Sequence, residues 1–160
     1  MKKIFFIVAF IATVFTQKSF AQDSATQAQS PQILSLYYNI KDALVAGNAN
    51  TAASNAEAFV KAANGIDSKS IPESNISTLV KDATAISQSK DLKEQRLHFA
   101  DLSTNLFAVA KTVKLTGQPV YEAFCPMKKA YWLSSSKTIK NPYFGSAMLT
   151  CGKVVEILNQ

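Results

Sequence analysis

The stretch that decides the fold runs over residues 91–113 and reads DLKEQRLHFADLSTNLFAVAKTV. The side chains that recur in it every three or four residues are Leu92, Arg96, Phe99, Leu102, Leu106, Val109 and Val113. This spacing is typical of one face of an α-helix. Asp91 is a suitable N-cap, and Gly117 and Pro119 follow the run, so the sequence predicts a long amphipathic helix between them.

Three further helices are predicted upstream of this stretch. The first has Pro31 in its first turn and ends at Gly47-Asn48. Asn50 and Thr51 can cap an alanine-rich second helix, and residues 76–87 carry the apolar stripe of a third. Four helices with short links predict a mainly α fold, an antiparallel helical bundle that forms a single domain over residues 31–160.

The chain changes character after Pro119 and becomes rich in aromatic residues. Residues 120–124 and 131–133 have the composition of two short strands, which would form a small hairpin around Lys128 and Lys129. Asn141-Pro142 is a cap followed by an N1 proline and predicts a short helix reaching Thr150. The apolar residues 154–158 are either a strand or a last helical turn.

Residues 1–21 have the layout of a secretory signal peptide. Two lysines precede an apolar run over residues 4–15, and Ser19-Phe20-Ala21 form a small-x-small cleavage site. A membrane anchor is the alternative, but Thr16-Gln17-Lys18 interrupts the apolar run before it reaches the roughly 20 residues that a span needs. We expect cleavage after Ala21 and a soluble periplasmic or secreted protein. Residues 22–30 lack apolar periodicity and predict a flexible leader.

Charge and composition exclude two classes of function. Lys2, Lys3 and Lys18 lie in the signal peptide, which leaves 14 basic and 11 acidic residues and a formal charge of +3. This scattered surplus argues against nucleic-acid binding, which needs clustered Lys and Arg. The single histidine, His98, and the absence of a nucleophile elbow, a glycine-rich phosphate loop or a zincin motif predict that the protein is no enzyme.

Both cysteines lie close in sequence to a methionine, in Cys125-Pro126-Met127 and in Met148-Leu149-Thr150-Cys151. Residues two apart in an extended segment, or three apart in a helix, point to the same side. Each cysteine is therefore expected to face the same way as its methionine. Two thiolates and two thioethers, if they converge, form a soft ligand set that prefers cuprous copper to zinc, calcium or magnesium.

A disulfide is the competing interpretation of the two cysteines. In an oxidising compartment Cys125 and Cys151 would close a loop of about 26 residues and stabilise the fold by roughly 3 to 4 kcal/mol. The nearby methionines would then only fill gaps in the core. By the same reasoning, His98 is a half-buried helix residue satisfied by Arg96 or Asp101.

Six ordered motifs resemble the domain-of-unknown-function family numbered 3347. They are residues 95–103 (QRLHFADLS), Val120-Tyr121, Cys125-Pro126-Met127, residues 130–134 (AYWLS), residues 139–145 (IKNPYFG) and residues 148–152 (MLTCG). The resemblance is dense from about Gln95 to Glu156 and looser over the upstream helices. It departs from the family pattern after Cys125-Pro126-Met127, where only Lys128 and Lys129 precede the Ala-Tyr-Trp run.

The resemblance implies a module of Bacteroidetes secreted proteins, found also at the C-terminal end of heavy-metal efflux adaptors. It implies a role in handling copper or a related soft metal, as a carrier or as an accessory of an efflux system. The implied metal ligands are Cys125, Met127, Met148 and Cys151, with His98 as a further candidate. The alternative function is that of a disulfide-stapled helical interaction module without metal.

Overall fold

The computed structural model describes the backbone of residues 21–159 and the side chains of residues 32–159. Apart from Ala21, the predicted signal peptide lies outside the described residues. In the part of the chain that is described, no helix is both long enough and apolar enough to cross a membrane.

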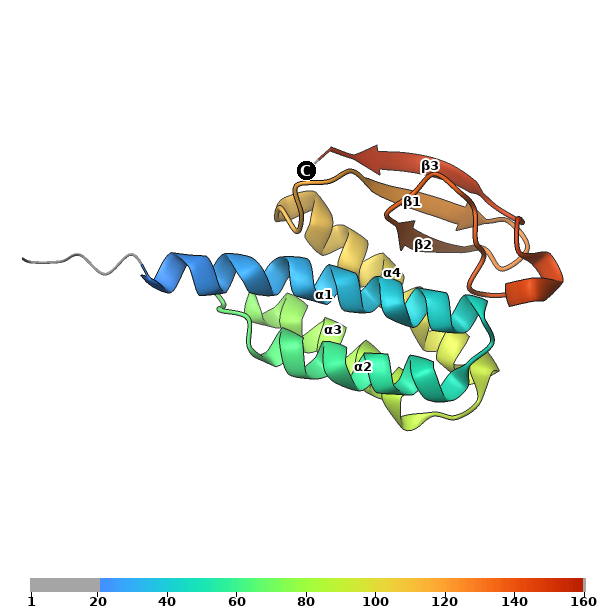
Figure 1. The fold of residues 1–160 in the computed structure, drawn as a ribbon, viewed down its shortest axis with the longest axis horizontal. Coiled ribbons are helices and arrows are strands. Elements are labelled where there is room, and N and C mark those ends of the chain that lie inside the picture. Colours follow the sequence, from blue (N-terminus) through green and yellow to red (C-terminus); the bar gives the residue numbers. More distant parts are fainter. Residues whose placement is uncertain (1–20, 160) are drawn as a thin grey trace, which may run out of the picture.

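Four helices are followed by a small sheet (Figure 1). The helices are α1 (Ala21–Val45), α2 (Ala49–Asn64), α3 (Glu73–Gln88) and α4 (Leu92–Thr112), and each packs against the next. The C-terminal elements are β1 (Val120–Cys125), β2 (Ala130–Ser134), the short 3₁₀ helix η1 (Gly145–Met148) and β3 (Lys153–Leu158). The predicted mainly α fold, a helical bundle with a small C-terminal hairpin, is confirmed.

The N-cap predicted for α4 is correct, and the one predicted for α2 is wrong. Asp91 caps α4 as predicted, because its carboxylate accepts a hydrogen bond from the Lys93 N–H at 2.6 Å. The cap of α2 is Asn48, not the predicted Asn50 or Thr51. Its side-chain oxygen accepts the Thr51 N–H at 3.0 Å, which places Asn50 and Thr51 in the first turn.

Helix α1 begins at Ala21 and therefore runs through residues 22–30, for which the sequence predicts a flexible leader. Pro31 lies inside this helix and not in its first turn. Alanine and glutamine recur over residues 22–30, and both are good helix formers even without an apolar stripe. Their propensity accounts for the helical backbone that the apolar periodicity does not reveal.

The sheet has the strand order β2-β1-β3, and both pairs are antiparallel. The predicted hairpin is present, with Cys125 opposite Ala130 and the Lys129 N–H bonded to the Cys125 carbonyl at 2.8 Å across the turn. The C-terminal apolar residues form strand β3, which decides between the two alternatives for them. The helix predicted from Asn141 to Thr150 is reduced to the single turn η1.

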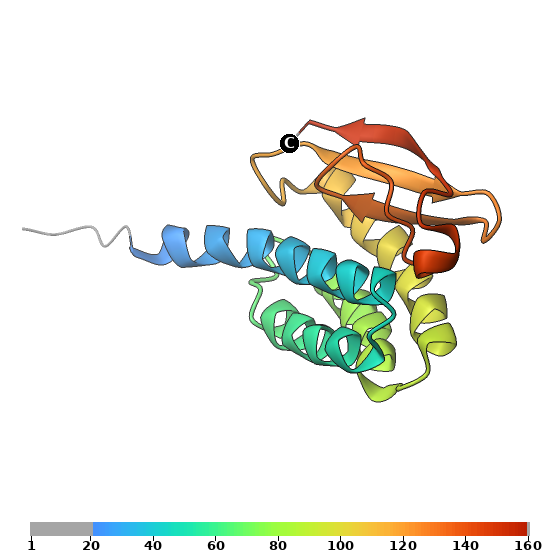
Figure 2. The same ribbon diagram turned by 45° about the vertical axis from the view of Figure 1, so that its right-hand side comes forward.

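The sheet lies on one side of the bundle, over α1 and α4, with α2 and α3 beyond them (Figures 1 and 2). A chain of buried hydrogen bonds joins the two parts. The Leu133 N–H, on β2, donates to the Tyr37 hydroxyl of α1 at 2.9 Å. Ser103, on α4, donates its own hydrogen to the Phe99 carbonyl, so the Tyr37 hydroxyl is the donor in its 2.7 Å bond to Ser103 Oγ.

A second tyrosine binds the same edge of β2. The Tyr143 hydroxyl donates to the Tyr131 carbonyl, and its ring lies between Trp132 and Phe99, with centroids 6.1 Å from each. Phe99 in turn stacks on Tyr37 at 5.0 Å. Edge-strand groups that would otherwise lack partners are thus bound by side chains of the bundle and of the loop after β2.

We predict that Tyr37→Phe lowers the free energy of unfolding by about 1 to 3 kcal/mol, because it leaves the buried Leu133 N–H without an acceptor. Tyr38→Phe is the matched control. Its ring is partly buried in α1, and its hydroxyl makes no hydrogen bond among the described residues, so a change within about 0.5 kcal/mol is expected. Urea unfolding measures both. Equal losses in the two variants would show that the Tyr37 hydroxyl does not hold the sheet on the bundle.

Candidate functional site

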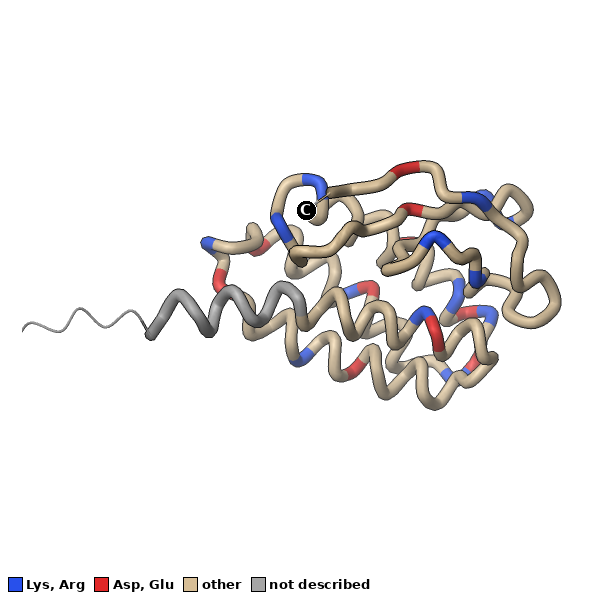
Figure 3. The backbone as a smooth tube through the Cα atoms, turned by 45° about the horizontal axis from the view of Figure 1, so that its top comes forward, with Lys and Arg blue, Asp and Glu red and all other residues tan. Residues whose placement is uncertain are grey.

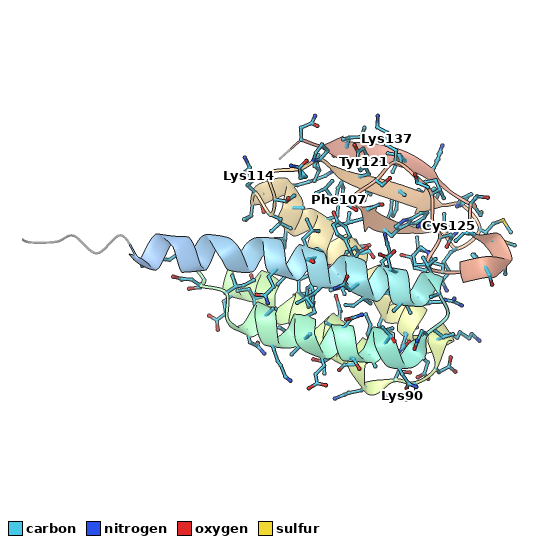
Figure 4. The ribbon with its side chains drawn as sticks, in the orientation of Figure 1. Lys90, Phe107, Lys114, Tyr121, Cys125 and Lys137 are labelled. Carbon is cyan, nitrogen blue, oxygen red and sulfur yellow. The ribbon has the colours of Figure 1, made fainter. Side chains whose placement is uncertain are left out.

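The two cysteines meet at one end of the sheet. Cys125 is the last residue of β1, and Cys151 lies between η1 and β3. Strands β1 and β3 pair antiparallel with Phe124 opposite Lys153, so the segments just beyond this pair adjoin. Figure 4 shows Cys125 at the end of the sheet beside η1.

Gly152 brings the chain from η1 close to β1. Its φ of +148° is a conformation that residues with a side chain rarely adopt. A Cβ atom at this position would lie 2.6 Å from the Trp132 ring and 3.0 Å from the Phe124 carbonyl oxygen. Only glycine allows this close approach, which places Cys151 beside Cys125.

The two thiols are free and interact directly. The Cys151 thiol is hydrogen-bonded with the Cys125 side chain and with the Met127 backbone. Burial raises the pKa of the Cys151 thiol above its ordinary value, and the neighbouring Cys125 raises it further, while the Met127 N–H opposes the rise. Cys151 therefore stays mostly protonated at neutral pH.

The sulfur of Cys125 is fully buried and accepts hydrogen bonds from two N–H groups. The Lys128 backbone N–H lies 3.4 Å from Sγ, and the Asn141 side-chain amide lies 3.2 Å from it. Hydrogen-bond donors of this kind also orient the ligands in metal sites. Two N–H groups therefore point at the buried Cys125 sulfur from the turn after β1 and from Asn141.

Asn141 organises the loop that contains the second cysteine. One amide hydrogen goes to Cys125 Sγ and the other to the Cys151 carbonyl at 2.6 Å. Its side-chain oxygen accepts the Tyr143 N–H at 2.8 Å and the Phe144 N–H at 3.3 Å. The predicted role of Asn141 as the cap of a short helix is wrong, because the N-cap of η1 is Phe144, and Asn141 instead closes the turn that precedes it. Its two contacts with the cysteine segments have no signal in the sequence.

Arg96 ties this loop to the bundle. Its guanidinium donates to the Pro142 carbonyl at 2.9 Å and to the Leu44 carbonyl, near the end of α1, at 3.0 Å. Gly145 packs closely against the end of α1 and against Arg96. A Cβ atom at this position would lie 2.9 Å from the Val45 carbonyl oxygen and 3.0 Å from the Arg96 guanidinium. Sequence reasoning assigned Arg96 to His98 and missed this function.

The two candidate methionines lie at the surface beside the cysteines. Met127 is 64% exposed in the β1–β2 turn, and Met148, at the end of η1, is 40% exposed. Their backbones both reach Cys151: Met127 through the hydrogen bond to the thiol, and Met148 through its carbonyl, which accepts the Cys151 N–H at 3.1 Å. Cys125 is fully buried and Met127 is exposed in the turn after β1, so the prediction that these two side chains face the same way is wrong. The four sulfur atoms nevertheless belong to two adjacent segments.

His98 lies elsewhere in the fold. It is close enough to Asp82, on α3, to oppose the rise in the pKa of that carboxyl, a rise caused mainly by burial. Asn105, two helical turns further along α4, hydrogen-bonds the same Asp82 carboxylate at 2.7 Å. The α3 side of α4 therefore holds His98, and Arg96 on another side of the helix contacts the cysteine loop. Over residues 32–159, no three His, Cys, Asp or Glu side chains converge as a metal-binding group.

Comparison with known proteins assigns a family to the helical part. Residues 33–118 match the family model described as "Protein of unknown function (DUF3347)". The match covers the bundle, with His98 and Arg96, and ends before Cys125. The chain matches no curated protein and no solved structure.

We predict that Asn141→Ala lowers the free energy of unfolding of the reduced protein by about 2 to 4 kcal/mol, because several buried groups lose their partner at once. Asn64→Ala, at the exposed end of α2, is the control and should change stability by less than about 0.5 kcal/mol. Urea unfolding in the presence of a reductant measures both. If the two variants behave alike, Asn141 does not hold the cysteine loop.

Alkylation of the folded, reduced protein should distinguish the two thiols. Cys151 is partly exposed and Cys125 is fully buried, so iodoacetamide should modify Cys151 first. Because the pKa of Cys151 is raised, its rate at pH 7 should fall below that of an ordinary thiol and rise by about tenfold per pH unit as the thiolate forms. Peptide mass spectrometry gives both rates. Faster modification of Cys125 would contradict the arrangement described.

Proposed function

The chain belongs to the family described as "Protein of unknown function (DUF3347)", and we propose that it binds one soft metal ion, most favourably cuprous copper, through Cys125 and Cys151. The observation that carries the proposal is the contact between two free thiols, one of them a buried sulfur that accepts two N–H groups. Thiolates are the ligands that cuprous copper prefers.

The composition of the site favours cuprous copper over zinc. A structural zinc ion takes four ligands from cysteine, histidine and carboxylate side chains. In the described part of the chain only two such groups, Cys125 and Cys151, come together here. The donors that remain nearby are the thioethers of Met127 and Met148, which select soft ions. Both methionines are exposed and have three rotatable bonds, so they can turn toward an ion held by the thiolates.

Charge near the site is compatible with two thiolates around a monovalent ion. Such a complex carries one net negative charge, and the exposed Lys128, Lys129 and Lys153 flank the two cysteine segments. Elsewhere acidic and basic residues are interspersed over the bundle and the sheet (Figure 3). This pattern supports the expectation that nucleic acid is not the partner, since a nucleic-acid footprint needs clustered positive charge.

The proposed role is that of a periplasmic or secreted carrier, buffer or efflux accessory. The location rests on the signal-peptide layout of residues 1–21, and the link to efflux adaptors rests on the family resemblance. A periplasmic efflux adaptor or another protein that receives the ion is the proposed partner. The second candidate function is a disulfide-stapled interaction module, which the contact between the two thiols also favours.

Competition with a chromophoric cuprous chelator under reducing conditions tests the metal site. We expect one ion per protein, near-complete loss of binding in Cys125→Ser and in Cys151→Ser, and weaker binding with an intact fold in Met127→Leu and Met148→Leu. His98→Gln is the control and should bind as the unaltered protein does, because His98 lies on the α3 side of α4. Apparent affinity should increase with pH, since the raised pKa of Cys151 means that the ion must displace a proton.

The disulfide interpretation predicts a different pattern in the same variants. Replacing either cysteine would then lower the thermal stability of the oxidised protein only, and the methionine variants would have no effect on any ligand. If the reduced, unaltered protein binds cuprous ion no more tightly than the double cysteine variant, the metal proposal is wrong.

A further inference from the structure

A pocket of about 260 Å³ lies at the opposite end of β2 from the cysteines, between α1 and the loop that follows the strand. The side chains that line it are polar or charged: Lys41, Asp42, Ser134, Ser135, Ser136, Thr138 and Lys140. None of them belongs to the sulfur site. Figure 4 marks Lys137 on the same loop.

Lys41 is the unusual member of this group. Only 7% of its side chain is exposed, although lysine is rarely buried without several partners. Its ammonium lies 3.1 Å from the Asp42 carboxylate and 5.7 Å from the centre of the Tyr38 ring. An ammonium has three hydrogens to donate, and the Asp42 side chain, 60% exposed, takes up one. The buried cation thus retains donors for a ligand in the pocket.

The loop presents hydroxyl groups arranged to donate. The Ser134 hydroxyl oxygen accepts the Ser136 N–H at 3.2 Å, and the Ser136 hydroxyl oxygen accepts the Thr138 N–H at 3.1 Å. Each oxygen is already used as an acceptor of a backbone N–H, so its own hydrogen is available for a ligand. The loop conformation is therefore fixed by the same groups that face the pocket.

We propose that this pocket binds a small tetrahedral oxyanion, of the chemistry of inorganic phosphate or sulfate. Lys41 and Lys140 supply two positive charges against the one carboxylate of Asp42, which leaves the pocket positive. Charge-assisted hydrogen bonds from ammonium groups and hydroxyls to oxyanion oxygens are strong, and they come here from α1 on one side and from the loop on the other. The volume exceeds that of one phosphate ion and leaves room for bridging water.

Titration of the purified protein with sodium phosphate, followed by amide NMR at pH 7 and constant ionic strength, tests the proposal. We expect saturable shifts confined to the region of Lys41 and residues 134–140. Lys41→Met should weaken phosphate binding by about tenfold or more. Lys61→Met is the matched control, because Lys61 also pairs with one carboxylate, at 2.9 Å, but is exposed; it should leave binding unchanged.

The phosphate affinity of Asp42→Asn distinguishes a ligand-binding role of Lys41 from a purely structural one. Removing the carboxylate that competes for the ammonium should tighten phosphate binding, and the amide spectrum reports whether the fold is kept. Sulfate should compete with phosphate, and acetate should do so poorly. Chemical-shift changes that do not saturate would overturn the proposal, as would equal losses of phosphate affinity in Lys41→Met and Lys61→Met. Weaker phosphate binding in Asp42→Asn would overturn it as well. If acetate competes as well as sulfate, the pocket is a carboxylate site and the proposal is wrong.

Discussion

The hydrogen bond from the Leu133 N–H to the Tyr37 hydroxyl is the constraint on which the C-terminal half depends. A three-stranded sheet of five- and six-residue strands is marginal by itself and needs a surface to pack against. Here the edge of β2 that faces the bundle would also leave backbone groups buried without partners. Tyr37 meets both requirements. Its ring packs in the helical core, and its hydroxyl accepts a hydrogen bond from the edge of β2 and donates one to Ser103.

Two separate sets of contacts position the two cysteines. Cys125 is the last residue of β1, which pairs with the docked strand β2. Cys151 is held by Asn141, and the neighbouring Pro142 carbonyl is bound by Arg96 of the bundle. The two sets are connected by the hydrogen bond from the Asn141 amide to Cys125 Sγ. Neither thiol is therefore placed by its own strand or turn alone, and a change in the bundle can alter the distance between them.

Much of the fold could be read from the sequence because its signals are local. The 3.6-residue period marked the helices, Asp91 marked the start of α4, and the composition around Lys128 marked the hairpin. The loop contacts of Arg96 could not be derived in this way, since its acceptors lie 46 and 52 residues away. Once Arg96 is known to face the loop, the place of His98 follows: at about 100° per residue, positions 96 and 98 on one helix point some 200° apart, so both cannot face the same loop.

The family match covers the helical bundle but not the two cysteines. The residues that dock the sheet and hold the loop from the bundle, Tyr37, Ser103 and Arg96, lie within the matched residues 33–118. Cys125 and Cys151 lie beyond the match. The family match therefore covers the residues that hold the sheet and the loop, while both thiols lie in the part of the chain after Pro119. The bundle holds the sheet and the loop through the backbone atoms of Leu133 and Pro142, so these two hydrogen bonds do not depend on which side chains the end of the sheet carries.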